Sequence, residues 1–427
     1  MSKLDREQER LLLQARLDAG KTQAERNRSG QFATPGALAR DIVRLGVSLL
    51  GKQRPIRFLD PAFGTGAFFS ALLPETPAGK IESAKGFELD PYYAVPARQL
   101  WQDTQLDLQI ADFTRMISPL RDEDRFNLLI CNPPYVRHHH IAIEEKTRLQ
   151  ETTEKASGVR IAGLAGLYCY FLGLSHAWMQ RDGIAGWLVP SEFMDVNYGK
   201  AIKRYLLDKV TLLRIHRFDP NDVQFDDALV SSAIVWFRND PPPANNEVEF
   251  TFGGSLFDPK IARSVSATEL RTEAKWTRFP ASDVRDGVVR CRLSDLFTIT
   301  RGIATGGNSF FILTRDEIRG RELPFEVFRP ILPSPRLLYP KPVLARAISE
   351  DRSLLHRVWM ALNNLEPSSV LGEGRVYGGG LHKLEPRELG NVDATPLLEA
   401  ISELHIETGP TQPGLFDLES ISLLDSS

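Results

Sequence analysis

The chain contains the stretch Phe58-Leu59-Asp60-Pro61-Ala62-Phe63-Gly64-Thr65-Gly66-Ala67-Phe68, an apolar strand that runs into a glycine-bearing turn and a helix start. Such a turn lets backbone amides approach a ligand closely at a helix N-terminus. The dinucleotide-binding fingerprint requires a small residue three positions after Gly66, where this chain has Phe69. The stretch therefore predicts either a ligand loop, with Asp60, Gly64 and Gly66 as its key residues, or an ordinary tight turn.

Strands and helices alternate on both sides of this stretch. Candidate strands are 56–60, 84–88, 106–110, 126–131 and 184–189, with helical stretches at 91–101 and 164–180 and late strands at 210–217 and 231–237. The alternation predicts an α/β fold with a doubly wound, mostly parallel sheet. Residues 1–30 are predicted to form a charged helix and then a polar loop at 26–30, before a helix with Thr34 as its N-cap and Pro35 in its first turn.

Prolines at positions 241–243 stand among turn-forming residues and predict an interdomain linker. We therefore expect a first domain at 1–240, a linker at 241–246, a second domain at 247–400 and an acidic, flexible tail at 401–427. Beyond the linker the βα rhythm is lost, and short strand candidates at 247–252 and 296–301 predict a mixed α+β domain.

The composition is that of a globular enzyme, with 427 residues of which 42% are hydrophobic and 25% charged. The N-terminus is too charged for a signal peptide, and no apolar run approaches the ~20 residues of a membrane span. We therefore expect a cytoplasmic protein with no membrane partner. Three widely spaced cysteines argue against a disulfide framework and a Cys-rich zinc site.

Charge is distributed unevenly along the chain. The net charge is −3, but residues 398–427 contain six acids and no Lys or Arg, so that −3 − (−6) = +3 remains for residues 1–397. A mildly basic body is compatible with nucleic-acid binding through a local cleft, although charge alone does not predict it.

A second motif, Asn132-Pro133-Pro134-Tyr135, follows directly on an apolar strand. Its groups suit methylation of an amino nitrogen, whose lone pair is delocalised into a ring and attacks a methyl group poorly unless acceptors draw its hydrogens out of plane. Asn132 offers a side-chain oxygen, Pro133 a carbonyl held by its ring, and Tyr135 an aromatic face for stacking. The alternative is a Pro-Pro-Tyr peptide ligand, which would belong in a polar linker.

Two acidic positions support a nucleoside cofactor. Glu88, at the end of the second strand, can accept hydrogen bonds from both hydroxyls of a ribose. Asp112 and Phe113 follow the third strand and can bind and stack on an adenine.

With these motifs in this order, the chain resembles amino-group DNA methyltransferases of the TaqI-type and Eco57I-type adenine-specific families over residues 30–240. The resemblance implies the class I S-adenosylmethionine-dependent methyltransferase fold, S-adenosyl-L-methionine as cofactor and transfer of its methyl group to N6 of a flipped adenine in double-stranded DNA. It assigns the cofactor contacts to Thr34, Asp60, Gly64, Gly66, Glu88, Asp112 and Phe113, and the catalytic loop to Asn132, Pro133, Pro134 and Tyr135. It also implies a target-recognition role for 247–400 and a restriction-modification setting with a cognate restriction endonuclease.

The resemblance departs from the family pattern at one position. An aromatic residue expected to pack on the extruded base fits Tyr198 only if the alignment slips by one residue. Methylation of an RNA base or of a protein glutamine, and a catalytically inactive nucleic-acid-binding module, remain open as alternatives.

Two further chemistries are disfavoured. Adjacent histidines at 138–140 cannot easily converge on one ion, so no metal site is expected, and the run is placed along the DNA cleft instead. Cys131 precedes Asn132 and is expected to point into the sheet, which argues against a cysteine-dependent attack on cytosine.

The tail carries one more hypothesis. Gln412 is followed three and four residues later by Leu415 and Phe416, as in the short peptide that binds the bacterial sliding clamp. The alternative is that Leu415 and Phe416 pack on the protein's own surface.

Overall fold

The computed structural model describes residues 3–51, 53–219, 232–280, 291–299, 313–325, 375–377 and 381–395, together with residues 360, 362, 365 and 397. The chain divides into two compact units. The first comprises Met1–Asp286 with Arg375–Lys383, and the second comprises Gly287–Gly374 with Leu384–Ser427.

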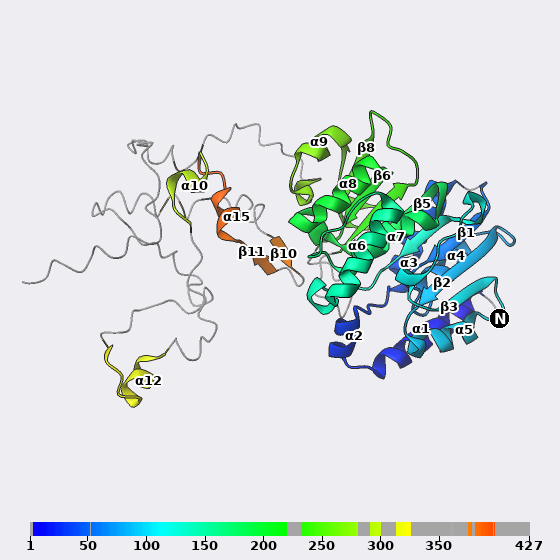
Figure 1. The fold of residues 1–427 in the computed structure, drawn as a ribbon, viewed down its shortest axis with the longest axis horizontal. Helices are drawn as coiled ribbons and strands as arrows, with labels where there is room; N and C mark the ends of the chain where they lie inside the picture. The colour runs from blue at the N-terminus through cyan, green and yellow to red at the C-terminus, as the bar shows by residue number, and fades with distance from the viewer. Residues whose placement is uncertain are drawn as a thin grey trace, which may run out of the picture. The chain divides into compact units, whose positions relative to one another are not determined.

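A nine-stranded sheet forms the centre of the first unit, in the order β3-β2-β1-β4-β5-β7-β6-β8-β9 (Figure 1). Its strands are β1 (Ile56–Asp60), β2 (Ile81–Glu88), β3 (Leu106–Ile110), β4 (Phe126–Cys131), β5 (Met179–Pro190), β6 (Thr211–Arg217), β7 (Ser232–Arg238), β8 (Glu247–Gly254) and β9 (Pro259–Ser266). Strands β3, β2, β1, β4 and β5 are parallel, whereas β7 is antiparallel to both of its neighbours. The predicted doubly wound, mostly parallel sheet is therefore confirmed.

Helices cover both faces of this sheet. The described helices of the first unit are α1 (Lys3–Ala19), α2 (Gln23–Ser29), α3 (Gly36–Leu50), α4 (Ala67–Glu75), α5 (Pro91–Trp101), α6 (Ile143–Ser157), α7 (Leu167–Ser175), α8 (Lys200–Asp208) and α9 (Ala267–Thr272). Successive strand residues point to opposite faces, so Leu128 packs with α3 and α4 while Leu129 packs with α6, α7 and α8. The sheet is thus buried between two apolar cores, which explains the nearly continuous apolar sequence of β4.

The parallel strands bring the motifs to one edge of the sheet. Asp60 and Glu88 end β1 and β2, Asp112 follows β3, and Asn132 follows β4. In open α/β sheets, ligands bind outside the carboxyl ends of the strands, where the strand order reverses. Here the order reverses between β1 and β4, so the topology places the cofactor loop beside the Asn132 loop.

The interdomain boundary predicted at 241–246 is wrong. Strand β8 pairs in parallel with β6, and β9 extends the same sheet, so residues 247–266 belong to the first unit. The prolines form a turn between β7 and β8, and the Thr211 hydroxyl donates to the carbonyls of Asp240 and Pro241 at 3.0 and 3.1 Å. Prolines that end a strand occur both in turns within a domain and in linkers between domains, and the sequence alone does not distinguish these two cases.

The N-terminal prediction also needs correction. Residues Arg26–Ser29 lie in α2, whose N-cap Thr22 forms a capping box with Glu25, and not in a loop. Helix α3 begins at Gly36 with Pro35 as its N-cap, and the Thr34 hydroxyl does not cap the helix but accepts a hydrogen bond from the Asn132 side chain.

The described parts of the second unit are short. They include α10 (Leu293–Leu296), α12 (Arg315–Gly320), α15 (Pro386–Gly390) and one antiparallel bridge between Arg292 and Asp393. The strand predicted at 296–301 is wrong at its first residue, because Leu296 is the last residue of helix α10. Strands β10 (Arg375–Tyr377) and β11 (Leu381–Lys383) form an antiparallel hairpin that belongs to the first unit. The proposed clamp-binding residues Gln412, Leu415 and Phe416 lie outside the described residues.

Two findings on the described residues concern membrane spans and metal-ligand groups. Among the described helices, none has both the length and the apolar character needed to cross a membrane. Within the same residues, no three His, Cys, Asp or Glu side chains are grouped so that they could hold a metal ion.

Candidate active site

The loop after β1 is shaped by its glycines. Gly64 and Gly66 both adopt left-handed conformations, with φ of 56° and 91°. A Cβ atom at Gly66 would lie 2.5 Å from the Phe63 ring, whereas one at Gly64 would meet no described atom within 4 Å. Only glycine fits at Gly66 without displacing the turn, and the backbone at Gly64 borders open space that a ligand can approach.

Two acids lie at this loop. The Glu88 carboxylate accepts from the backbone amides of Gly64 at 2.8 Å and Asp90 at 2.9 Å, and Asp60 accepts from the Ala62 amide at 3.1 Å. Burial raises the pKa of Asp60 to about 8, with a smaller contribution from the negative charge of Glu88. Burial also raises the pKa of Glu88. Because burial disfavours the charged form of both carboxyl groups, they suit a ligand that brings hydroxyl donors or positive charge.

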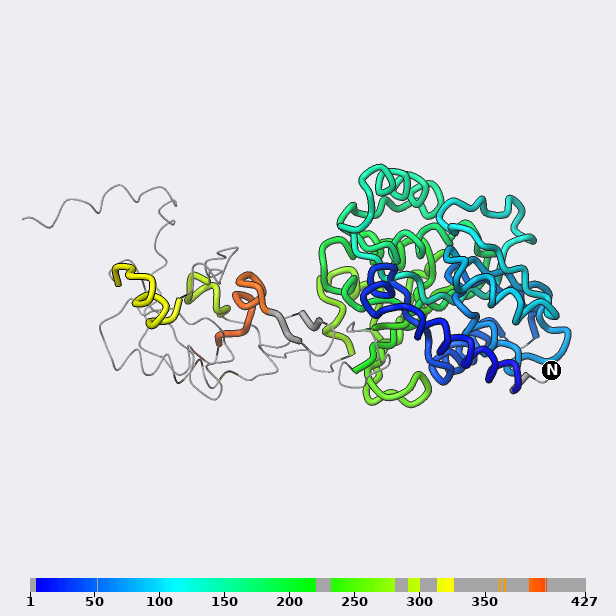
Figure 2. The backbone as a smooth tube through the Cα atoms, turned by 90° about the horizontal axis from the view of Figure 1, so that it is seen from below, coloured from blue at the N-terminus to red at the C-terminus, as the bar shows by residue number. Residues whose placement is uncertain are grey.

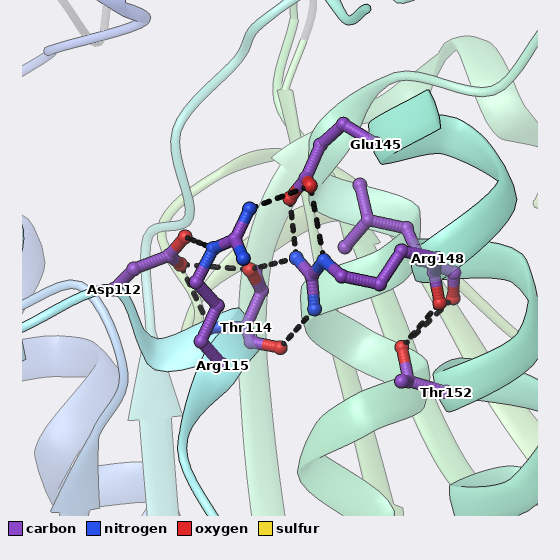
Figure 3. Close-up of polar contacts among 7 residues, drawn as sticks. Asp112, Thr114, Arg115, Glu145, Arg148 and Thr152 are labelled. Atoms are coloured by element: carbon purple, nitrogen blue, oxygen red, sulfur yellow. Dashed lines mark hydrogen bonds and ion pairs between the residues drawn. The ribbon is translucent and has the colours of Figure 1, made fainter. Parts of the chain in front are cut away.

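Asp112 belongs to a polar network between β3 and α6 (Figure 3). One of its oxygens accepts from the Thr114 amide and hydroxyl at 2.9 and 2.7 Å, and the other lies 3.3 Å from Arg115 Nε. Arg115 and Arg148 both bind Glu145, and Arg148 also donates to the Thr114 carbonyl and hydroxyl. The network joins the loop after β3 to the helix that follows the Asn132 loop.

The Phe113 ring is 3% exposed, and its centroid lies 5.4 to 5.5 Å from those of Phe87, Phe171 and Trp178. The described geometry thus gives this ring a packing role beneath the loop. Its predicted stacking on an adenine stays a prediction.

The Asn132 amide is held on one side only. Its nitrogen donates to the Phe32 carbonyl at 3.0 Å and the Thr34 hydroxyl at 3.2 Å. Its oxygen is buried and has no hydrogen-bond partner in the described part of the chain. A buried acceptor without a donor is costly, so this oxygen marks a place where a ligand donor is expected.

Tyr135 is fixed beside Asn132. Its hydroxyl donates to the Leu188 carbonyl at 3.0 Å, and its amide approaches the Gly30 carbonyl at 3.3 Å. The ring centroid lies 5.6 Å from that of Phe32 and 6.5 Å from that of Tyr168. Pro133 is buried and Pro134 partly buried between Asn132 and Tyr135.

Tyr198 reaches the same cluster through Tyr168. It lies on a single 3₁₀ turn, Asn197–Gly199, and its hydroxyl is 3.4 Å from that of Tyr168. The structure therefore places Tyr198 near the Asn132 loop despite the slipped alignment. Its contact with a base stays a prediction.

Sequence reasoning missed Gly30 as a site residue. Gly30 caps α2 with φ of 65°, and a Cβ atom there would lie 2.4 Å from the Tyr135 nitrogen. The Ser29-Gly30 pair directly after a helical pattern was the available signal for a left-handed cap. Phe32 was also missed, because it acts through its backbone carbonyl, which no sequence pattern identifies.

The structure bears on one alternative chemistry, a cysteine-dependent attack on cytosine. Cys131 is fully buried in the core against α6 to α8, and burial raises the pKa of its thiol well above the ordinary value. A thiol that stays protonated and buried does not suit attack on cytosine. His138–His140 form a short 3₁₀ turn in which His139 and His140 are exposed.

Together, the strand order and the loops at its carboxyl edge define an open, mostly parallel α/β sheet with the candidate site where the strand order reverses. Residues 81–224 match the model of the Eco57I restriction-modification methylase family. The resemblance stated from the sequence is confirmed at that level.

Sequence relatives agree with this assignment. The chain is similar to the type II methyltransferase M.AccI of Acinetobacter calcoaceticus, with 28% identity over 305 residues, 67% of this chain and 53% of that protein. It is also similar to the type II methyltransferase M.XamI of Xanthomonas campestris pv. amaranthicola, with 26% identity and the same coverage. The chain thus spans about half the length of these relatives. Among solved structures, a putative class I S-adenosylmethionine-dependent methyltransferase from Listeria monocytogenes is 17% identical with a TM-score of 0.48, covering 61% of this chain and 76% of that one.

Proposed function

We propose that the chain is a site-specific DNA methyltransferase that transfers a methyl group from S-adenosyl-L-methionine to N6 of an adenine flipped out of duplex DNA. The observation that carries the proposal is the buried, unpartnered oxygen of Asn132, held in place by the two contacts of its amide nitrogen. An amino group can supply the donor that this oxygen lacks among the described residues.

The residues at the edge of the sheet fit the cofactor. The Glu88 carboxylate, already oriented by two backbone amides, can accept the ribose hydroxyls. The backbone at Gly64 leaves room for close approach, and the buried Asp60 favours a ligand with positive charge. When bound, S-adenosylmethionine supplies an electrophilic methyl group on a positively charged sulfur.

The Asn132 loop then acts on the target base. The Asn132 oxygen and the Pro133 carbonyl accept the hydrogens of the amino group, which concentrates its lone pair on nitrogen. The Tyr135 ring, held by its hydroxyl, supports the base by stacking, and Tyr198 lines the same pocket. The excess proton of the product amine leaves to solvent, so no general base is required. Base flipping places the amino group in this pocket because it cannot be reached inside the duplex.

Sequence selectivity is assigned to the second unit. In this proposal the site residues of the first unit bind the cofactor and the target base. Recognition of the surrounding DNA sequence needs further side chains that contact base edges in a groove. The family supports a restriction-modification setting, and a cognate restriction endonuclease is proposed as a functional partner. The proposed location is the cytoplasm, where the DNA substrate lies.

The test is to incubate the full chain with labelled S-adenosylmethionine and duplex DNA, digest the DNA, and identify the labelled nucleoside by mass spectrometry. We expect N6-methyladenine within one short sequence. Parallel reactions with RNA and with a protein-glutamine substrate address the alternatives, and label in those alone would overturn the proposal. Cofactor binding without transfer to any substrate would instead indicate an inactive binding module.

A further inference from the structure

The N-terminal residues 3–34 contact the loops after β1, β2 and β4, and we name them the N-terminal strap. At the cofactor loop, Arg10 donates to the Thr65 hydroxyl at 3.3 Å, and this hydroxyl donates to Gln14 at 2.6 Å. At the Asn132 loop, the strap supplies the Phe32 carbonyl and the Thr34 hydroxyl. Figure 2 shows the strap, in dark blue, running over the surface of the first unit.

Lys21 joins the strap to the loop after β2. It lies in the turn between α1 and α2, and its Nζ contacts Asp90 Oδ2 at 2.5 Å and Gln31 Oε1 at 3.0 Å. The same nitrogen lies 5.1 and 4.7 Å from the ring centroids of Tyr92 and Tyr93. With 20% of its side chain exposed, this ammonium is more enclosed than an ordinary surface lysine.

Both partners of Lys21 lead to the site. The Asp90 amide donates to Glu88 Oε1 at 2.9 Å, so the position of Asp90 helps to set the orientation of the Glu88 carboxylate. Gln31 donates to Asp90 Oδ2 at 3.0 Å and directly precedes Phe32, whose carbonyl holds the Asn132 amide. Although burial raises the pKa of Asp90, its hydrogen bonds with Lys21 and Gln31 bring that pKa below the ordinary value, so Asp90 remains ionised.

We propose that Lys21 is a positioning residue that fixes Asp90 and Gln31 together, so that Glu88 and the cofactor-binding end of the strap are already in place when S-adenosylmethionine arrives. This inference rests on the proposed function. It requires no contact between Lys21 and the cofactor. Because preorganisation acts before binding, its loss weakens cofactor binding more than it slows transfer from the bound complex.

The chain offers a matched control. Lys85 on β2 also pairs with a carboxylate, that of Asp107 at 2.8 Å, and lies 5.9 Å from the Phe87 ring centroid. Its side chain is 26% exposed, close to the value for Lys21, yet its partner lies on β3 and has no contact with the site loops among the described residues. Lys85→Met therefore removes a similar ion pair without touching Asp90 or Gln31.

The experiment compares Lys21→Met, Lys21→Arg and Lys85→Met in the full chain. We expect Lys21→Met to raise the Kd for S-adenosylmethionine, measured by calorimetry, by about tenfold, the scale for a partly buried ion pair with cation–π contacts. The single-turnover methylation rate at saturating cofactor should stay within about threefold of the unsubstituted chain. Lys21→Arg should recover most of the affinity, and Lys85→Met should bind normally.

A double-substitution cycle tests the route through Asp90. If Lys21 acts by holding Asp90, adding Lys21→Met to Asp90→Asn should cost much less affinity than Lys21→Met alone. Fully additive effects, an unchanged Kd in Lys21→Met, or an equal loss in Lys85→Met would overturn the inference. An unsubstituted chain that does not bind S-adenosylmethionine would overturn the proposed function itself, whereas one that binds and methylates leaves the Lys21 result to decide the inference alone.

Discussion

In the side chain of Asn132, the amide nitrogen is hydrogen-bonded, whereas the amide oxygen has no partner among the described residues. Because its nitrogen donates to the Phe32 carbonyl, which only accepts, turning the amide over would place two acceptor oxygens against each other, and the observed orientation is therefore the favoured one. The orientation that the proposed chemistry needs is therefore built into the fold before any substrate binds.

Asn132→Ala should reduce the single-turnover rate of methyl transfer by at least about 100-fold, the scale for losing one positioned polar group in a transition state. Cofactor affinity should change little, because Asn132 does not contact the Glu88 loop among the described hydrogen bonds. Rapid-quench kinetics and calorimetry measure the two quantities. A variant that retained more than a tenth of the rate would remove Asn132 from this role.

Asp60 predicts a pH dependence of stability. Its pKa is raised by burial from 3.8 to about 8, so the cofactor-free folded chain keeps a proton that the unfolded chain has released. The free energy of unfolding should therefore fall as pH rises from about 4 towards 8, by at most about 1.4 kcal/mol per pH unit for this group. Glu88, whose pKa is also raised, adds to the same trend.

Asp60→Asn should remove the Asp60 part of that trend and raise the melting temperature of the cofactor-free chain at pH 8, with little difference at pH 4. Its affinity for the cationic cofactor should fall. Thermal melts across this pH range and calorimetry at pH 8 check both effects. A melting temperature that is lower than that of the unsubstituted chain at pH 8 would contradict the burial argument.

At the scale of elements, the end of α2 sets the position of the Asn132 loop. Gly30 terminates this helix in the left-handed conformation, and its backbone lies directly against Pro134 and Tyr135. The C-cap of α2 therefore packs directly on the Asn132 loop, although the two are about 100 residues apart in the sequence.

Gly30→Ala should lower both stability and methyl transfer, since the added Cβ strains the backbone and pushes on Tyr135. Gly79→Ala is the matched control, because Gly79 has φ of 78° but nothing described lies within 4 Å of a Cβ there. Both variants should lose about 1–2 kcal/mol of stability from the left-handed conformation. Urea unfolding gives the stabilities, and only Gly30→Ala should also slow single-turnover methylation. Equal rates for the two would show that contact with Tyr135 has no effect on transfer.

The elements that sequence predicted well are those whose signal is local. Strands at 56–60, 106–110 and 126–131 and the helix at 91–101 have the predicted bounds, because apolar runs and Pro91 at a helix start act within a few residues. The same strand pattern also predicted that Glu88 and Asn132 lie at the carboxyl ends of their strands. Three features depend on distant segments, which one sequence does not reveal. They are the pairing of β8 with β6, the contact of Arg10 with Thr65, and the contact of Lys21 with Asp90.

At the scale of the molecule, the corrected division of the chain changes where a truncation can succeed. A chain that ends near residue 246 lacks β8 and β9, so β6 loses its outer neighbour and becomes an unpaired edge. A chain that ends at Asp286 keeps the whole nine-stranded sheet.

We expect the chain ending at 246 to aggregate, and the chain ending at Asp286 to stay soluble and to bind S-adenosylmethionine with at most about tenfold weaker affinity while losing sequence selectivity. Size-exclusion chromatography, calorimetry and sequencing of the methylated DNA compare them. Full selectivity in the shorter chains would place the recognition residues in the first unit.

The hairpin β10–β11 belongs to the first unit, although the residues on both sides of it belong to the second. In terms of inheritance, a single crossover after Asp286 between two related genes would replace this hairpin together with the second unit. The resulting chimera would carry a hairpin that has not co-evolved with the first unit to which it belongs. Exchanges confined to residues 287–374 avoid this mismatch, so recombination that yields new specificities should favour paired breakpoints on either side of that segment.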